Sequence, residues 1–312
     1  MALARTLSRM DAARNGGQGP GGRFEYGSAE FNDEHFLKDV QQARETCKIW
    51  RSTMPAAPGS ELQADFDLLG AASCGAVARE LIHAAVDAIE SLLRLVDRGE
   101  SNDPRYVVDG PGNYTLMRAA LEAASQALWA LESTKRRTRR LRALQLWRED
   151  VKNLSSFLGE TKKVFTRVRR WDLESIGWEE NVRLARPSPE EFQTKDGRDR
   201  PVKSSNILRT VQKHGTAIKN LDGSPTDFTW LAAWQICSGF AHGKAWARGI
   251  FTDREVIGAA DGGSQQERSK PQLFTFLVLF QQTMTLLEAA MTRYAVLGEL
   301  HRTERATHED QN

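Results

Sequence analysis

The sequence predicts an all-α fold: a single-domain bundle of six to eight helices behind a disordered N-terminal tail. Apolar residues recur at helical spacings of three and four along most of the chain, and no stretch alternates apolar and polar residues as a strand does. Segments rich in Pro and Gly separate these stretches and end the helices. The expected parts are a disordered tail at 1–30, the bundle at 31–302 with long loops at 185–203 and 258–271, and a charged tail at 303–312.

The first expected helix covers residues 32–54. Five apolar residues in it follow one another at spacings of four, three, four and three, so they share one helix face. Asn32 or Asp33 is a suitable capping residue at its start, and Pro55 ends it. The five apolar residues are Phe36, Val40, Ala43, Cys47 and Trp50.

Three more helical regions are expected in the first half of the bundle. An apolar stripe from 61 to 96 predicts a region in which Gly70 and Gly75 are candidate breaks. Helices at 114–132 and 133–158 follow, each with leucines along one face.

The second half of the bundle is expected to add a short helix at 161–171, another at 204–214, a helix after Asp227 and a long final helix at 272–300. A short extended arm is expected at 250–257. The longest strongly apolar run is far shorter than the roughly 20 residues that a membrane-spanning helix needs, so no membrane partner is expected.

Composition and cysteine content favour a cytoplasmic protein. The chain is 40% apolar and 27% charged, which is ordinary for a soluble globular protein. Its three cysteines are widely spaced, so neither a disulfide framework nor a metal site is indicated. The N-terminal segment lacks the apolar core of a secretion signal. We therefore expect a cytoplasmic location, no cofactor and no bound metal.

The net charge of +2 conceals a strongly basic span. Between residues 135 and 170, 13 Lys and Arg residues stand against three acidic ones, and six of the basic groups lie at the positive end of the helix expected at 133–158. One hypothesis is a surface that binds RNA, DNA or a nucleotide. The alternative is a solvated helix face whose charges pair with acidic residues elsewhere in the fold or in a partner. The residues proposed to contact phosphate are Arg136, Arg137, Arg139, Arg140 and Lys244.

The most aromatic and least charged stretch, 227–246, is expected to be a helix that carries Ser238 and His242 one turn apart. A serine beside a histidine can form a nucleophile and its base. No acidic residue lies nearby in sequence to orient the histidine, and no strand-turn-helix elbow surrounds the serine, so a hydrolase triad is disfavoured. Arg118 and Glu122 complete the candidate set, either as an ion pair within one helix or as part of a polar network inside the bundle.

Several short motifs, taken in order, resemble a known family. They are Arg118-x-x-Leu121-Glu122, Trp129, an Arg-rich helix, Ser238-x-x-x-His242-Gly243 and a long final helix. Over roughly residues 66–300 this order resembles uncharacterised helical proteins common in high-GC actinobacteria. Those proteins are in turn similar to the HEPN-like helical bundles, which include abortive-infection proteins of the AbiV type. The resemblance implies an α-helical bundle, a tendency to dimerise and, as in active HEPN members, RNA cleavage without a metal.

The chain departs from the HEPN ribonuclease motif, which places an arginine a few residues before the histidine on one helix. No arginine closely precedes His242, and Arg248 follows it. A ribonuclease would have to take its arginine from another helix, the candidates being Arg118, Arg137 and Arg140.

Two functions stay open on the sequence alone. One is an RNA-linked component of stress or phage defence, with His242 as general acid and base. The other is a non-enzymatic scaffold or partner-binding module, in which Ser238, His242 and Arg118 form a structural polar network. The partners expected are RNA or a nucleotide, a second copy of the chain, or another protein. If Arg118, Arg137 or Arg140 and His242 surround one cleft that solvent reaches, the first is favoured. A sealed His242 with both nitrogens bonded would count against it.

Overall fold

The structure is a computed structural model that describes part of the chain. The described residues are 24–26, 29–31, 34–53, 55–97, 106–108, 110–161, 202–212, 228–259 and 265–299. Nine α-helices and only short strands occur in them, so the all-α prediction is confirmed, with one helix more than expected. Outside the described residues lie positions 1–23, nearly all of the helix expected at 161–171 and of the loop expected at 185–203, and the charged tail at 303–312.

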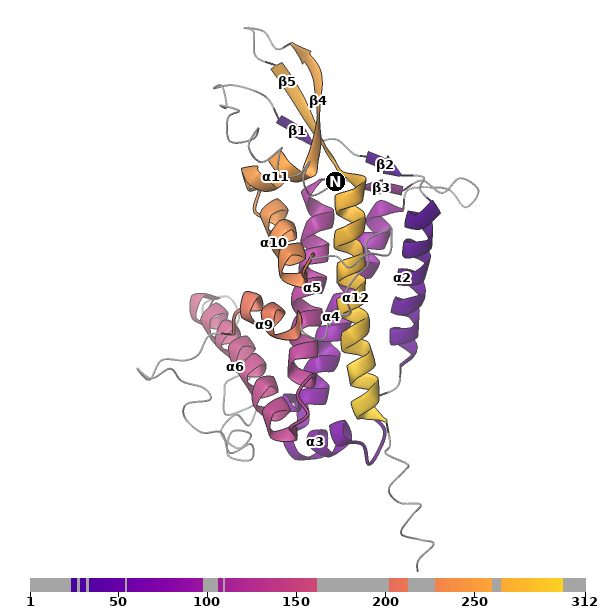
Figure 1. The fold of residues 1–312 in the computed structure, drawn as a ribbon. Coiled ribbons are helices and arrows are strands. Elements are labelled where there is room, and N and C mark those ends of the chain that lie inside the picture. Colours follow the sequence, from indigo (N-terminus) through magenta and orange to yellow (C-terminus); the bar gives the residue numbers. More distant parts are fainter. Residues whose placement is uncertain are drawn as a thin grey trace, which may run out of the picture. The chain divides into compact units, whose positions relative to one another are not determined.

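The elements are labelled in Figure 1. In chain order they are β1 (Phe24–Tyr26), β2 (Ala29–Phe31), α2 (Glu34–Ser52), α3 (Glu61–Leu69), the 3-10 turn η1 (Gly70–Ala72), α4 (Cys74–Val96), β3 (Tyr106–Val108), α5 (Pro111–Leu131), α6 (Arg136–Thr161), α9 (Ser204–Val211), α10 (Trp230–Ala241), α11 (Ala245–Phe251), β4 (Thr252–Ala259), β5 (Gln265–Pro271) and α12 (Leu273–Gly298).

The chain divides into two compact units, each assembled from segments that are far apart in sequence. Unit 1 comprises Met1–Arg51, Ala85–Glu122 and Thr216–Thr285. Unit 2 comprises Ser52–Ala84, Ala123–Gly215 and Leu286–Asn312. Each unit is described by itself below.

Aromatic side chains fill the core of unit 1. The five residues of the stripe predicted in α2 are all at most 1% exposed, so that prediction is confirmed. Phe36 of α2 meets Phe276 of α12 edge-on, with ring centroids 5.9 Å apart. Tyr114 of α5 stacks on Phe240 of α10 at a centroid distance of 3.9 Å and also meets Phe276 edge-on. Such pairs contribute about 0.5–1.5 kcal/mol each beyond the area that they bury, so they fix these helices within unit 1.

Short strands in unit 1 correct two expectations. β5 is the central strand of a three-stranded sheet, with β1 parallel on one side and β4 antiparallel on the other (Figure 1), and β2 pairs with β3 antiparallel. The tail expected at 1–30 therefore contains strand residues, and the loop expected at 258–271 contains all of β5. β1 and β2 are only three residues long and β5 is almost entirely polar, so none of them shows the sustained apolar alternation by which a strand is recognised in a sequence. The extended arm expected at 250–257 corresponds to β4.

In unit 2, a glycine ends helix α3. The Ser60 hydroxyl caps the start of this helix by accepting the N–H of Gln63 at 3.2 Å. The helix stops at Gly70, whose φ of 55° lies in the left-handed region that glycine adopts without strain. The predicted break at Gly70 is confirmed, whereas Gly75 lies inside α4. Leu144 of α6 packs against Ala72 in the buried core of this unit.

Helix α12 is the only helix in the described residues that is long and apolar enough, by length and composition, to cross a membrane. Of its most apolar window, 56% is buried inside the structure. The buried core helix of a soluble protein meets the same criterion, so the absence of a membrane partner stays a prediction.

Candidate functional site

The candidate site of unit 1 lies where helix α10 ends. The Thr229 hydroxyl caps the start of α10 by accepting the N–H of Ala232 at 3.1 Å. The helix ends at Ala241, His242 is its C-cap, and Gly243 follows with φ 62°. The expected continuous helix at 227–246 is therefore wrong. A glycine that takes up the left-handed conformation just after the cap ends the helix, and α11 begins two residues later.

Helices α10 and α11 approach each other closely at Gly239. A Cβ atom at this position would lie 2.7 Å from the ring of Trp246 and 2.8 Å from the Cβ of Ala247. No side chain other than hydrogen fits there, so α11 rests directly on the last turn of α10. The Trp246 ring also meets Phe251 edge-on at 6.4 Å.

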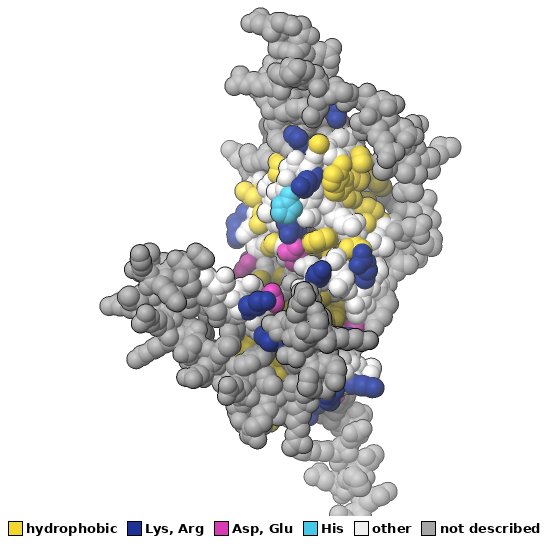
Figure 2. Space-filling view, turned by 90° about the vertical axis from the view of Figure 1, so that its left-hand side faces the viewer, with side chains coloured by type: hydrophobic (Ala, Val, Ile, Leu, Met, Phe, Trp, Pro, Cys, Tyr) yellow, Lys and Arg dark blue, Asp and Glu magenta, His cyan; other side chains and the backbone are white. Residues whose placement is uncertain are grey.

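An arginine from α5 contacts His242. The Nη1 atom of Arg118 lies 2.8 Å from Nε2 of His242, and the two residues are 124 positions apart in sequence. A guanidinium has only donors, so Nε2 must accept, and the imidazole in this contact is neutral with its proton on Nδ1. His242 is exposed, and Nδ1 has no hydrogen-bond partner among the described residues. A histidine is visible at the surface beside basic and acidic side chains in Figure 2.

Glu122 and Trp234 hold Arg118 in place. Glu122 Oε1 accepts from Arg118 Nε at 3.0 Å and from Trp234 Nε1 at 2.7 Å. The guanidinium carbon of Arg118 also lies 5.9 Å from the centroid of the Trp234 ring, within the range of a cation–π interaction. We call these four residues, Arg118, Glu122, Trp234 and His242, the His242 cluster.

Ser238 does not join this cluster. It lies one turn before His242, and within the described residues its hydroxyl makes no hydrogen bond to the imidazole; only the backbone N–H of His242 reaches back to the Ser238 carbonyl, at 3.0 Å. The neighbouring Cys237 is fully buried, and burial raises the pKa of its thiol. Neither residue has the arrangement of an activated nucleophile.

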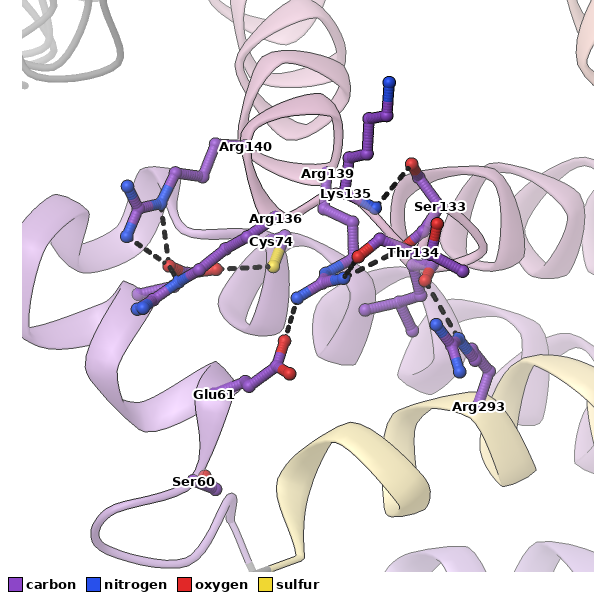
Figure 3. A network of polar contacts seen from close by, with 12 residues as sticks. Ser60, Glu61, Cys74, Ser133, Thr134, Lys135, Arg136, Arg139, Arg140 and Arg293 are labelled. Atoms are coloured by element: carbon purple, nitrogen blue, oxygen red, sulfur yellow. Dashed lines mark hydrogen bonds and ion pairs between the residues drawn. The ribbon is translucent and has the colours of Figure 1, made fainter. Parts of the chain in front are cut away.

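A second polar cluster lies in unit 2 around Asp65, which is fully buried. Figure 3 shows Arg136, Arg140 and Cys74 of this cluster, with dashed lines for their contacts. Asp65 Oδ1 accepts from Arg136 Nε at 2.6 Å and from Arg140 Nε at 2.7 Å. Its other oxygen accepts from the Cys74 thiol at 3.3 Å. Burial beside this carboxylate raises the pKa of Cys74 to about 12, so the thiol stays protonated.

Arg139 is committed to internal contacts. Its side chain is 1% exposed, and it forms an ion pair with Glu61 and donates to the Ser133 carbonyl at 2.8 Å (Figure 3). We call Glu61, Asp65, Cys74, Arg136, Arg139 and Arg140 the Asp65 cluster. Its two carboxylates supply the negative charge that the basic start of α6 requires.

The Asp65 cluster bears on the predicted phosphate-binding residues. Arg139 is buried and paired, which leaves it no surface for a nucleic acid. Arg136 and Arg140 are partly exposed, at 40% and 21%, but their guanidinium groups bind Asp65. Arg137 and Lys244 are exposed. Pairing with acidic residues of the same unit, the alternative considered for the basic span, thus accounts for three of the five residues.

Within the part of the chain that the structure describes, no group of three or more His, Cys, Asp or Glu side chains is arranged to hold a metal ion. The side chains of the His242 cluster present a neutral imidazole, a guanidinium and a carboxylate.

No protein-family model, no curated protein and no solved structure matches this chain. The HEPN-like relationship consequently stays a prediction.

Four residues of these clusters were not among the predicted site residues: Glu61, Asp65, Cys74 and Trp234. Asp65 falls on the buried stripe of α3 between Leu62 and Leu69, at spacings of three and four, and this place among apolar residues was the available signal. Trp234 belongs to the aromatic stretch at 227–246, in which nothing local distinguishes it from Trp230 and Trp246. The hydrogen bond from Trp234 to Glu122 joins residues 112 positions apart, and no local sequence pattern predicts such a contact.

Proposed function

We propose that this protein cleaves RNA without a metal ion, with His242 as the general base and Arg118 as the group that stabilises the transferring phosphate. The observation that carries the proposal is the 2.8 Å contact between Arg118 Nη1 and Nε2 of an exposed His242. Arg118 stands in for the arginine that the motif around His242 lacks. The resemblance to HEPN-like proteins favours a role in stress or phage defence.

The resting contact between the two side chains is compatible with catalysis. A phosphate oxygen is a stronger acceptor for a guanidinium than a neutral imidazole nitrogen. A bound phosphodiester is therefore expected to take the Nη1–H of Arg118 and free Nε2 of His242. Glu122 and Trp234 keep Arg118 oriented while this exchange occurs.

The reaction is a transesterification. Nε2 of His242 accepts the proton of the ribose 2′-hydroxyl, the 2′-oxygen forms a bond to phosphorus, and the bond from phosphorus to the 5′-oxygen breaks. Arg118 stabilises the negative charge that builds up on the phosphorane oxygens. Solvent, which reaches the exposed site, protonates the leaving 5′-oxygen and later removes the proton from the imidazolium. The products carry a 2′,3′-cyclic phosphate and a 5′-hydroxyl.

The second candidate is a non-enzymatic scaffold or partner-binding module. It is favoured by the double acceptance at Glu122 Oε1, which ties α5 to α10 within unit 1 whether or not a substrate ever binds. In this case Arg118 and His242 stabilise the fold only, without a contribution from the Ser238 hydroxyl.

The test is cleavage of a labelled single-stranded RNA in EDTA by the wild-type protein, His242→Ala and Arg118→Ala. We expect each substitution to slow cleavage by roughly 10²-fold or more. The products should carry cyclic phosphates, and a single 2′-deoxy substitution should block cleavage at its own position.

Two matched substitutions control for nonspecific effects. His83→Ala removes a histidine of unit 2, and Arg94→Ala removes an exposed arginine of α4. Both should cleave like the wild type. Equal cleavage by the wild type and His242→Ala, or cleavage by neither, would overturn the proposal in favour of the scaffold.

A further inference from the structure

Trp246 is a large apolar side chain exposed next to the His242 cluster. It is the second residue of α11 and is 46% exposed, whereas Trp230 and Trp50 are buried. Its ring is nonetheless held firmly, because its six-membered part lies against Gly239 and it forms a T-shaped pair with Phe251. A flat aromatic surface that is both exposed and fixed in orientation binds planar ligands at little cost in side-chain entropy.

The position of Gly239 places this ring close to His242. Gly239 and His242 are three positions apart at the end of α10. The helical hydrogen bond from His242 N to Ser238 O is intact at 3.0 Å. Side chains with this spacing are neighbours, with Cβ atoms about 5–6 Å apart. The Trp246 ring, which contacts Gly239, therefore lies about one helix turn from the imidazole. This separation is short on the scale of a nucleotide chain.

The charges around Trp246 favour a polyanion. Lys244 is exposed in the turn between His242 and Trp246, and Arg118 contacts His242 from α5. Alternating cationic and aromatic groups are what a single-stranded nucleic acid requires, since cations follow its phosphates and aromatic rings stack on its unpaired bases. A duplex keeps its bases stacked on one another and offers none to the ring.

We propose that Trp246 forms a stacking subsite for an unpaired nucleobase, adjacent to the phosphate that Arg118 and His242 engage. The subsite rests on the proposed function and adds its substrate class, which is single-stranded RNA. Trp246 is a positioning residue: it holds the base so that the neighbouring phosphodiester reaches His242.

The experiment measures binding separately from cleavage. A fluorescein-labelled 2′-O-methyl oligoribonucleotide lacks the attacking hydroxyl, so its affinity is read by fluorescence anisotropy on the wild-type protein without turnover. Trp246→Leu keeps an apolar side chain against Gly239 but removes the flat ring, and Trp246→Phe keeps a smaller ring. Phe274→Ala is the matched control, since Phe274 is an exposed aromatic of unit 1 (54% exposed) on α12.

We expect Trp246→Leu to weaken binding of the single strand roughly 10-fold, Trp246→Phe to weaken it less, and Phe274→Ala to leave it unchanged. The same oligonucleotide in a duplex should bind the wild type more weakly and without dependence on Trp246. Circular dichroism of each variant confirms that the helices are retained.

The outcomes separate this subsite from the proposed function. If the wild type cleaves RNA but Trp246→Leu binds the oligonucleotide as tightly as the wild type does, the subsite is overturned and the function stands. If binding depends on Trp246 but no RNA is cleaved, the subsite stands and the catalytic proposal fails. Absence of binding by the wild type overturns the subsite.

Discussion

The His242 cluster of unit 1 and the Asp65 cluster of unit 2 are built from the same kinds of group but differ in where their acceptors lie. In the Asp65 cluster the acceptor is a fully buried carboxylate, and two arginines together with a thiol converge on it. In the His242 cluster Arg118 donates to the partly exposed Glu122 carboxylate and to an exposed imidazole, whose Nδ1 has no hydrogen-bond partner among the described residues. Burial of the acceptor therefore separates the two clusters, and we propose that the exposed one receives a ligand.

Neutralising Asp65 is the strongest way to test this contrast. Asp65→Asn keeps the shape of the side chain but removes the charge that Arg136 and Arg140 share. We expect the free energy of unfolding to fall by about 2–3 kcal/mol, below the usual cost for fully buried pairs because both arginines can still reach water. Urea denaturation measures this. Asp67→Asn, at an exposed position of the same helix, should change stability by less than about 0.5 kcal/mol.

Gly239→Ala tests whether the exposed site is nevertheless tightly packed. The new methyl group would lie 2.7 Å from the Trp246 ring and 2.8 Å from the Ala247 Cβ, so α11 must shift. We expect a loss of about 1–2 kcal/mol. Gly112→Ala in α5 is the control, because its Cβ would meet no atom within 4 Å, and it should be neutral or slightly stabilising. Equal effects of the two substitutions would contradict the close approach of α10 and α11.

Glu122→Gln removes a carboxylate charge from the His242 cluster, as Asp65→Asn does from the Asp65 cluster. The amide oxygen still accepts from Trp234 and Arg118, and only the charge is lost, at a side chain that is 28% exposed. We expect a change of at most about 1 kcal/mol in the free energy of unfolding, because partly exposed ion pairs contribute little. A loss as large as that of Asp65→Asn would show that the two clusters do not differ as proposed.

Thiol labelling of the native protein is expected to be the smallest signal of all. All three cysteines are buried, and burial raises the pKa of Cys47 and of Cys74 to about 12. At pH 8, well below these values, the thiols are protonated, so the native protein should react negligibly with a thiol-specific reagent, whereas protein in urea should react at all three. Asp65→Asn should speed labelling of Cys74 while Cys237 stays protected, and mass spectrometry of labelled peptides separates the two sites.

Local patterns account for the parts of the fold that the sequence predicted. The stripe from Phe36 to Trp50 and the stop at Gly70 follow from helical periodicity and from the left-handed conformation of glycine, both of which act over a few residues. The strands could not be found this way. β5 is a polar segment, and its pairing with β1 depends on residues more than 200 positions away.

The candidate site was predicted in three of its four members but not in its geometry. Arg118, Glu122 and His242 were singled out, and the structure brings them together. Ser238 was also singled out and remains apart from them. Helix α10 ends one residue before His242, so the imidazole lies at the C-cap of this helix. A side chain from another helix can reach it there. Which arginine reaches it is decided by tertiary packing, and Arg118 belongs to the same unit as His242.

The construction of unit 1 from distant segments sets the order of events during synthesis. Gln281 donates to Asp39 at 2.8 Å, and these two residues are 242 positions apart in the sequence. His242 follows its partner Arg118 by 124 positions. At roughly 5–20 residues per second, the ribosome needs about 6–25 seconds to deliver that histidine after the arginine. A nascent chain that stalls after α6 would thus carry the basic helix without the His242 cluster, so translation itself times the appearance of the site.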